Sequence, residues 1–220
     1  NDTLLSGSGV DQLDGGDGVD SVEIIGSNIV LTNASAPGAS EDTLLSVERL
    51  HLIASGPDSV IDASAYTLGP VTIIGSSGDD TLKGGSGNDV ILAGSGNDEV
   101  SGGSGDDIIR GDSGADTLSG DAGDDTILGG GGRDLIDGNA DADILIGGGG
   151  PDTIRGGTGD DFVAGGGGRD SIDGDEGADT LFGGGGADNL AGGIGDDTLN
   201  GLPRNDSFNA VIGQDTLIGG

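Results

Sequence analysis

The sequence predicts an all-β solenoid, in which short strands stack at a fixed pitch and two nine-residue units form one coil of eighteen residues. Two observations predict this fold. The 220 residues include 52 Gly but only three Phe, one Tyr and no Trp or Met, too little bulky apolar material for a conventional globular core. In addition, a period of nine residues runs without a gap from Gly75 to Asn200.

The units of this periodic block share two fixed positions. Residues 75–200 make fourteen units, of which residues 84–92, Gly-Gly-Ser-Gly-Asn-Asp-Val-Ile-Leu, are typical. Position 8 is Leu, Ile or Val in every unit, from Leu82 to Leu199. Position 6 is Asp in every unit, namely Asp80, Asp89, Asp98, Asp107, Asp116, Asp125, Asp134, Asp143, Asp152, Asp161, Asp170, Asp179, Asp188 and Asp197. A disordered acidic chain has no need of an aliphatic residue at every ninth place, so the pattern favours a folded repeat.

Each unit is expected to consist of a six-residue Gly-rich turn followed by a three-residue strand, because Gly tolerates the backbone conformations of tight turns. If position 8 points inward, positions 7 and 9 point outward, and each unit contributes one side chain to the interior. So thin an aliphatic seam recovers little of the backbone entropy lost on folding. Something else must therefore bind the folded form preferentially.

The period divides the chain into three expected segments. Residues 1–23 form a first repeat block with its own register, residues 24–74 an irregular β insertion, and residues 75–220 the main array. The main array is degraded after residue 200, where Arg204 replaces the fourth-position Gly. Residue 1 falls in the middle of a unit, which favours a fragment of a longer protein.

Composition excludes several classes of function. The formal charge of −33 makes nucleic acid a poor partner, and the absence of Cys excludes thiolate metal sites. No apolar run is long enough for a membrane span, and the first residues show no secretion signal. The single histidine, His51, is expected on a strand surface, and the chain has no catalytic motif, so an enzyme is not predicted.

The units resemble the nonapeptide G-G-x-G-x-D-x-U-x of the repeats-in-toxin (RTX) proteins, the haemolysin-type calcium-binding family. The resemblance covers about two thirds of the chain. It implies a right-handed parallel β-roll, a calcium-loaded solenoid of eighteen residues per coil, here with an irregular β insertion. It also implies that each Ca²⁺ lies between turns one coil apart, bound by two position-6 carboxylates and by turn carbonyls. Such oxygen ligands are those that a hard cation prefers.

Carried onto this chain, the resemblance pairs aspartates eighteen residues apart, from Asp80 with Asp98 to Asp179 with Asp197. Two rows of seven aspartates give about twelve Ca²⁺ sites, whose charge would offset most of the −33. Further candidate ligands stand at position 6 outside the main block, namely Asp206, Asp2, Asp11 and Asp20, with Asp215 as a weaker candidate.

Departures from the motif are few. Asp112, Asp121, Asn139 and Asp175 replace the glycine at position 2 and Asp141 replaces that at position 4, and the unit around Asp141 is expected to be the least occupied. The acidic residues at position 5 are expected to be exposed charges rather than ligands, namely Asp79, Asp106, Asp124, Asp160 and Asp196.

The two outward faces differ in polarity. On one face, nine of the fourteen residues at positions 7 and 9 are apolar, including Phe162 and Phe182, against two on the other. A stripe of this kind usually marks a contact surface. It is expected to pack on a neighbouring domain, on a second copy, or on the strands of residues 24–74.

The predicted function is a calcium-triggered structural and secretion module of a larger extracellular protein. The resemblance implies type I export of the unfolded chain and folding outside the cell. An adhesin, or a polysaccharide-contacting appendage of an extracellular enzyme such as a protease, lipase or epimerase, is the alternative.

Overall fold

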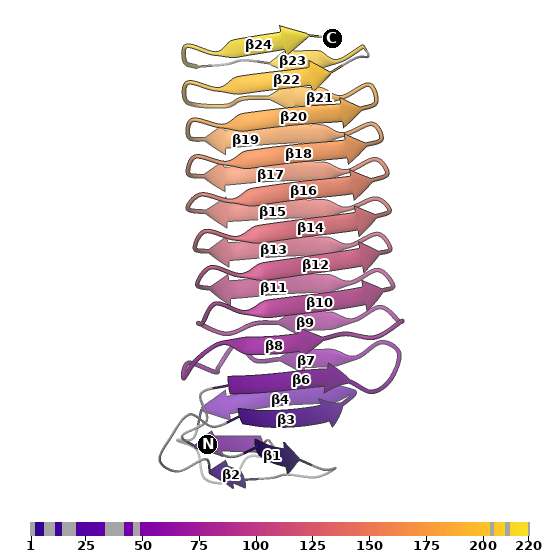
Figure 1. The fold of residues 1–220 in the computed structure, drawn as a ribbon, viewed down its shortest axis with the longest axis vertical. Coiled ribbons are helices and arrows are strands. Elements are labelled where there is room, and N and C mark those ends of the chain that lie inside the picture. Colours follow the sequence, from indigo (N-terminus) through magenta and orange to yellow (C-terminus); the bar gives the residue numbers. More distant parts are fainter. Residues whose placement is uncertain are drawn as a thin grey trace.

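A computed structural model of the chain describes residues 3–6, 12–14, 21–33, 42–45, 49–202, 205–209 and 212–219. These residues form two parallel twelve-stranded sheets that stack coil upon coil along one axis (Figure 1). The first sheet contains, in spatial order, β1 (Thr3–Ser6), β3 (Ser21–Gly26), β6 (Arg49–Ala54), β8 (Val71–Ile74), β10 (Val90–Ser95), β12 (Ile108–Ser113), β14 (Thr126–Gly131), β16 (Ile144–Gly149), β18 (Phe162–Gly167), β20 (Thr180–Gly185), β22 (Thr198–Leu202) and β24 (Thr216–Gly219). The second sheet contains β2 (Gln12–Asp14), β5 (Asp42–Leu45), β4 (Asn28–Asn33), β7 (Val60–Asp62), β9 (Thr81–Lys83), β11 (Glu99–Ser104), β13 (Thr117–Ala122), β15 (Leu135–Ala140), β17 (Thr153–Thr158), β19 (Ser171–Glu176), β21 (Asn189–Ala191) and β23 (Ser207–Asn209). The predicted all-β roll is confirmed.

The strand register confirms eighteen residues per coil in the main array. Ile91 of β10 pairs with Ile109 of β12, and Leu118 of β13 pairs with Ile136 of β15. Because consecutive strands alternate between the two sheets, each strand pairs with the next-but-one strand in the sequence.

The strands are longer than predicted. Most strands of the main array have six residues rather than three, as in β10, and they continue through positions 1 to 3 of the next unit. The turn shrinks to positions 4 to 6. The prediction was wrong because the leading glycines, read as turn residues, have neighbours in adjacent coils and join the parallel ladder.

The interior is a continuous aliphatic seam. Position 8 is at most 2% exposed in every unit from Leu82 to Leu199, so this residue points inward as predicted. Position 1 is Gly in every unit of residues 75–200 except at Ala93, and it is buried from Gly84 onward. Ala63 and Tyr66, which lie in the loop between β7 and β8, belong to the same buried core.

Strands of residues 24–74 belong to the stack itself, with longer and less regular coils. Leu50 of β6 pairs with Val71 of β8, 21 residues later, and Ser21 of β3 pairs with Arg49, 28 residues later. In the second sheet, β5 lies between β2 and β4 although it follows β4 in sequence. These strands extend the two sheets at one end and do not cover an outward face, which excludes one of the three expected partners of the apolar stripe.

The described residues contain strands but no helix that is long and apolar enough to cross a membrane.

Candidate metal centre

The position-6 aspartates form two buried rows along the turns, one row on each side of the roll. All fourteen, from Asp80 to Asp197, have an exposed fraction of 2% or less. Each precedes the inward residue at position 8, and each except Asp143 follows a turn glycine at position 4, so the repeat places it on the inside of the turn. Carboxylates are almost never so fully buried unless they have a partner.

One carboxylate oxygen of each aspartate ties neighbouring coils together. Oδ1 of Asp116 accepts a hydrogen bond from the backbone N–H of Asp98 at 2.9 Å, and Oδ1 of Asp134 accepts one from Asp116 at 3.0 Å. The same bond recurs along both rows. It begins with Asp80 N–H to Asp98 at 2.8 Å in one row and ends with Asp197 N–H to Asp215 at 3.1 Å in the other. The structure therefore brings together the aspartates eighteen residues apart that the sequence paired.

The other oxygen has no partner. Oδ2 is buried and accepts no hydrogen bond in thirteen aspartates, namely Asp98, Asp107, Asp116, Asp125, Asp134, Asp143, Asp152, Asp161, Asp170, Asp179, Asp188, Asp197 and Asp206. In the first two units the oxygen is satisfied instead, because Ser76 N–H and Gly85 N–H donate to Oδ2 of Asp80 and Asp89 at 2.6 Å. A buried, unpartnered carboxylate oxygen is costly, and a bound cation would remove that cost.

The raised pKa values of these carboxyls also indicate that the buried carboxylates lack a positively charged partner. Burial raises the pKa of Asp107, Asp143 and Asp179 to about 7, opposed by the backbone hydrogen bond to Oδ1 and reinforced by neighbouring carboxylates. Burial raises the pKa of four more to about 6, namely Asp116, Asp125, Asp152 and Asp161. Burial disfavours the charged form in each case, so a positive ion placed beside it would restore ionisation.

Glycine at position 1 leaves room beside Oδ2. A Cβ placed on Gly129 would come within 2.5 Å of Oδ2 of Asp134 and within 2.7 Å of the Gly147 carbonyl oxygen. The same two kinds of oxygen, the carboxylate of its own turn and the carbonyl one coil later, surround the glycines from Gly102 to Gly174. A side chain at these glycines would occupy the space between these oxygens; within residues 75–200 the one side chain at position 1 is that of Ala93, in the unit of Asp98.

Turn carbonyls complete the oxygen lining. Within residues 75–200, the carbonyls of positions 4 and 5 accept no backbone hydrogen bond. Those of position 6 all bond to the adjacent coil, and so do those of position 3 from Ser113 onward except Thr158, as Ser113 does to Gly96 N–H at 2.9 Å. No group of three or more acidic or histidine side chains converges on one point among the described residues. The donor set available is thus two carboxylates per gap together with free carbonyls, which suits a hard cation such as Ca²⁺.

The predicted ligands outside the main block are placed only in part. Asp206 lies at the expected point, where its Oδ1 accepts a hydrogen bond from Asp188 N–H at 3.0 Å. Asp2, Asp11 and Asp20 lie outside the described residues.

The motif departures occupy strained backbone. The four acidic or amide residues in place of the second glycine, and Asp141 in place of the fourth, all have positive φ, between 66° and 78°. Asp and Asn tolerate this conformation better than other non-glycine residues. At Asp141 the carboxylate bond is retained, because Asp143 Oδ1 still accepts the Asp125 N–H at 2.8 Å. The backbone bond that Gly132 N–H donates to the Gly149 carbonyl at 2.8 Å has no counterpart from Asp141 to Thr158.

Position-5 acids are exposed as predicted, but they also have a structural role that the sequence reasoning missed. Oδ1 of Asp79 accepts the backbone N–H of Asn97 at 2.7 Å, and Oδ1 of Asp160 accepts that of Ala178 at 2.9 Å. Asn88 and Asn97 accept in the same way, so a short oxygen acceptor at this position links coil to coil. The recurrence of Asp and Asn at position 5 was the available signal.

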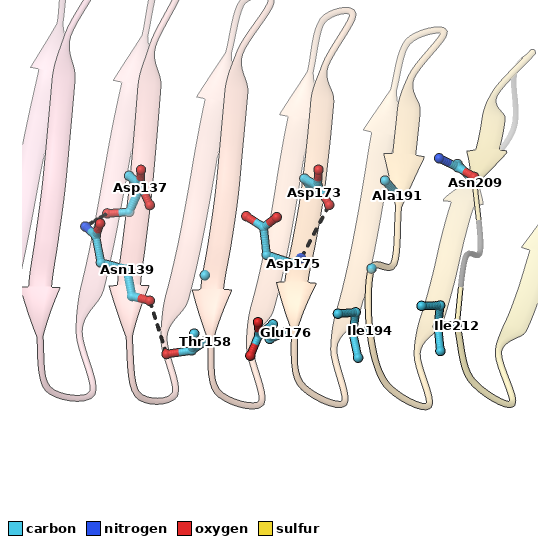
Figure 2. Close-up of a pocket in the computed structure, with 12 residues that line it drawn as sticks. Asp137, Asn139, Thr158, Asp173, Asp175, Glu176, Ala191, Ile194, Asn209 and Ile212 are labelled. Atoms are coloured by element: carbon cyan, nitrogen blue, oxygen red, sulfur yellow. Dashed lines mark hydrogen bonds between the residues drawn. The ribbon is translucent and has the colours of Figure 1, made fainter.

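A second surface feature is a groove of about 620 Å³ on the outer face of the second sheet (Figure 2). Asp137 and Asp173 lie along one side, Glu176, Ile194 and Ile212 along the other. Gly157 and Gly193, which have no side chain, also line the groove.

Comparison with known proteins supports the metal centre. The family model of the RTX calcium-binding nonapeptide repeat (4 copies) matches residues 1–22 and, in overlapping segments, 72–207. A search among curated proteins found no match. The matched residues are well over half of the chain, and they include the whole of both aspartate rows. The chain therefore belongs to the family of RTX calcium-binding repeat proteins.

Proposed function

We propose that this chain is a calcium-triggered folding module of a larger extracellular protein. In this proposal each Ca²⁺ lies between two position-6 carboxylates one coil apart, from Asp80 with Asp98 to Asp179 with Asp197, giving about twelve ions in the main array. The observation that supports it is the two rows of buried Oδ2 atoms without a partner, thirteen atoms in all. Unoccupied gaps would leave the carboxylates of each row buried and unpaired, which opposes folding.

Binding of an ion only to the folded form supplies the switch. Stability then rises by RT ln(1 + [Ca²⁺]/Kd) for each site, so many sites along one roll make folding depend steeply on calcium. Extracellular calcium modules bind at about 10⁻⁴–10⁻³ M, far above cytosolic concentrations. The chain would accordingly stay unfolded during synthesis and type I export, and fold outside the cell.

A calcium titration followed by far-ultraviolet circular dichroism tests the proposal. The expected result is a coil-like spectrum in excess chelator and a β spectrum in millimolar calcium, with magnesium much less effective because its octahedral geometry and tight hydration suit these sites poorly. A β spectrum of full amplitude in metal-free buffer would contradict it.

The groove on the second sheet favours one further candidate, a binding module for a polar extracellular polymer such as a polysaccharide. Its carboxylate, amide and hydroxyl lining, from Asp137 and Asn139 to Thr158 and Asn209, is of the kind that hydrogen-bonds to sugars. Glycan-array binding that Asp173→Ala abolishes, while the calcium titration is unchanged, would support this function. Binding to no glycan would contradict it.

A further inference from the structure

One outward face of the roll carries no charge. The four strands β14, β16, β18 and β20 together contain no acidic or basic residue, and their outward side is called the neutral face below. On the opposite sheet, each of the five strands β11, β13, β15, β17 and β19 contains at least one charged residue, for example Glu99, Asp121, Asp137, Arg155 and Asp173. In a chain of net charge −33, an uncharged face of this extent needs an explanation.

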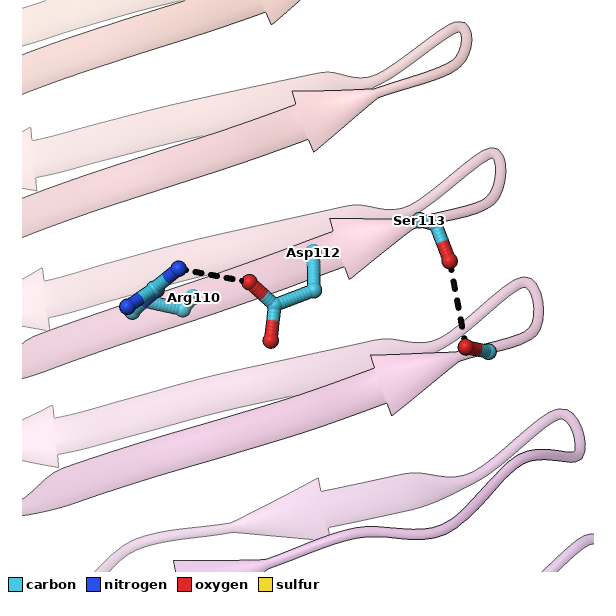
Figure 3. A network of polar contacts seen from close by, with 4 residues as sticks. Arg110, Asp112 and Ser113 are labelled. Carbon is cyan, nitrogen blue, oxygen red and sulfur yellow. Dashed lines mark hydrogen bonds and ion pairs between the residues drawn. The ribbon is translucent and has the colours of Figure 1, made fainter.

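The neutral face is apolar and exposed. Ile144 is 46% exposed and Phe162 41% exposed, and the Phe162 ring lies against that of Phe182 with centroids 5.4 Å apart. Toward β10 this face ends at β12, where Arg110 forms an exposed ion pair with Asp112 at 2.8 Å (Figure 3). An exposed apolar patch with a polar border is typical of a protein contact surface.

Glycines on this face indicate that something approaches closely. Position 3 is Gly131, Gly149, Gly167 and Gly185 on these four strands, and none of them has a left-handed φ. A Cβ would meet nothing within 4 Å at Gly131, and only ordinary contacts at 3.9 to 4.0 Å at the other three. The second sheet accommodates Thr158 and Glu176 at the same position. Internal packing therefore does not require these glycines, whereas close approach of another surface does.

The two edges of the neutral face have opposite charges at matching intervals. Arg133 and Arg169 are exposed in the turns that follow β14 and β18, 36 residues and thus two coils apart. Asp124 and Asp160 are exposed in the turns that precede the same two strands, at the same interval. A face that is basic at one edge and acidic at the other, with equal spacing, is complementary to itself.

We propose that the neutral face is the interface of a homodimer, in which two rolls lie side by side around a two-fold axis parallel to the stacking direction. In this arrangement strands run antiparallel across the interface, so the turn after β14 of one copy lies opposite the turn before β14 of the other. Arg133 then faces Asp124 of the second copy, and Arg169 faces Asp160. The second sheet carries Glu99, Asp137 and Asp173 on its outward side, so two copies that met through that face would bring like charges together.

The size of the face sets the expected affinity. Four six-residue strands, spaced at ~4.8 Å with ~3.3 Å per residue, present roughly 400 Å² of flat surface, and inclusion of the uncharged β22 and β24 adds about half as much again. This is below the ~800 Å² per partner of a stable complex. The dimer is accordingly weak and forms at protein concentrations of roughly 10⁻⁵–10⁻⁴ M.

Sedimentation equilibrium in excess calcium, over about 10⁻⁶ to 10⁻³ M protein, tests the proposal with a matched pair of variants. Ile144→Asp places a charge on the neutral face and should weaken association at least tenfold. Leu135→Asp is the control, because Leu135 occupies the same repeat position one unit earlier, is also 46% exposed and lies on the opposite sheet. It should leave the dimer constant unchanged within twofold.

A charge exchange tests the geometry. Arg133→Asp alone and Asp124→Arg alone should each weaken association several-fold, and the double variant should restore it. Three results would overturn the proposal: a wild type that stays monomeric over the whole concentration range, equal effects of Ile144→Asp and Leu135→Asp on association, or no restoration of association in the double variant.

The dimer rests on the proposed function only because it requires a folded roll. Circular dichroism of the same samples reports folding separately, so a loss of calcium dependence contradicts the proposed function, whereas a folded monomer contradicts the interface.

Discussion

Replacing Asp134 by Asn should change stability in opposite directions with and without calcium. Asp134 is shared by two neighbouring gaps of one row, Asp116 with Asp134 and Asp134 with Asp152, and its Oδ1 accepts the Asp116 N–H at 3.0 Å. Asn retains that acceptor and the size of the side chain, but it removes the negative charge. The substitution therefore separates the metal role of the carboxylate from its role in linking coils.

The magnitude in calcium follows from the shared position. At a free calcium concentration a hundred times Kd, one site contributes about 2.7 kcal/mol, so the loss of two sites should lower the free energy of unfolding by about 5 kcal/mol. Calorimetry should register two fewer ions per chain for Asp134→Asn, but only one fewer for Asp80→Asn, because Asp80 begins its row.

In chelator the sign should reverse. The buried Oδ2 of Asp134 has no partner and its pKa is raised by burial, so the charge opposes folding. An amide at this point can donate to the nearby Gly147 carbonyl, which lies beside Oδ2 around the Cβ position of Gly129. Removal of an unpaired buried charge should stabilise whatever metal-free roll forms by about 1–2 kcal/mol.

Urea unfolding followed by circular dichroism, in calcium and in chelator, measures both effects. Glu99→Gln is the control, since Glu99 is an exposed outward carboxylate of β11 and should alter neither the stability nor the number of ions. Destabilisation of equal size in both media would refute the reasoning, because it would show that the carboxylate serves only the backbone hydrogen bond.

Three further predictions concern acid, glycine and backbone strain. Burial raises the folded-state pKa of seven position-6 aspartates to about 6–7, with Asp107 and Asp116 among them. The metal-free roll should therefore hold more protons than the unfolded chain and become more stable as the pH falls from 7 to 5; a β signal in chelator that declines over this range would contradict it. Gly129→Ala should lower calcium affinity at Asp134 in calorimetric titrations, whereas Gly131→Ala, two residues away with open space before it, should not. Leu202→Gly should raise the unfolding free energy by about 1 kcal/mol, since Leu202 has a φ of 62°, whereas Leu135→Gly, in an equally exposed but extended strand, should lower it; melting temperatures in calcium distinguish the two outcomes.

The sequence by itself determined the repeat architecture. A strict nine-residue period fixes which residue faces inward, and Leu82 to Leu199 are buried as the period requires. It also fixes which aspartates become neighbours, because two units close one coil and carry Asp116 over Asp98. These features depend only on a spacing that is repeated many times, so local pattern and global fold agree.

Tertiary structure decided what the period does not encode. Residues 24–74 pair at separations of 21 and 28, and β5 enters the second sheet out of order, which no fixed spacing predicts. Strand length depends on whether the Gly-rich segments form hydrogen bonds with the next coil. The tertiary structure was also needed to show that Oδ1 of each described position-6 aspartate accepts a hydrogen bond while Oδ2 of thirteen of them has no partner. In each case the deciding contact joins residues of different coils, and contacts over such distances depend on the assembled stack rather than on any one segment.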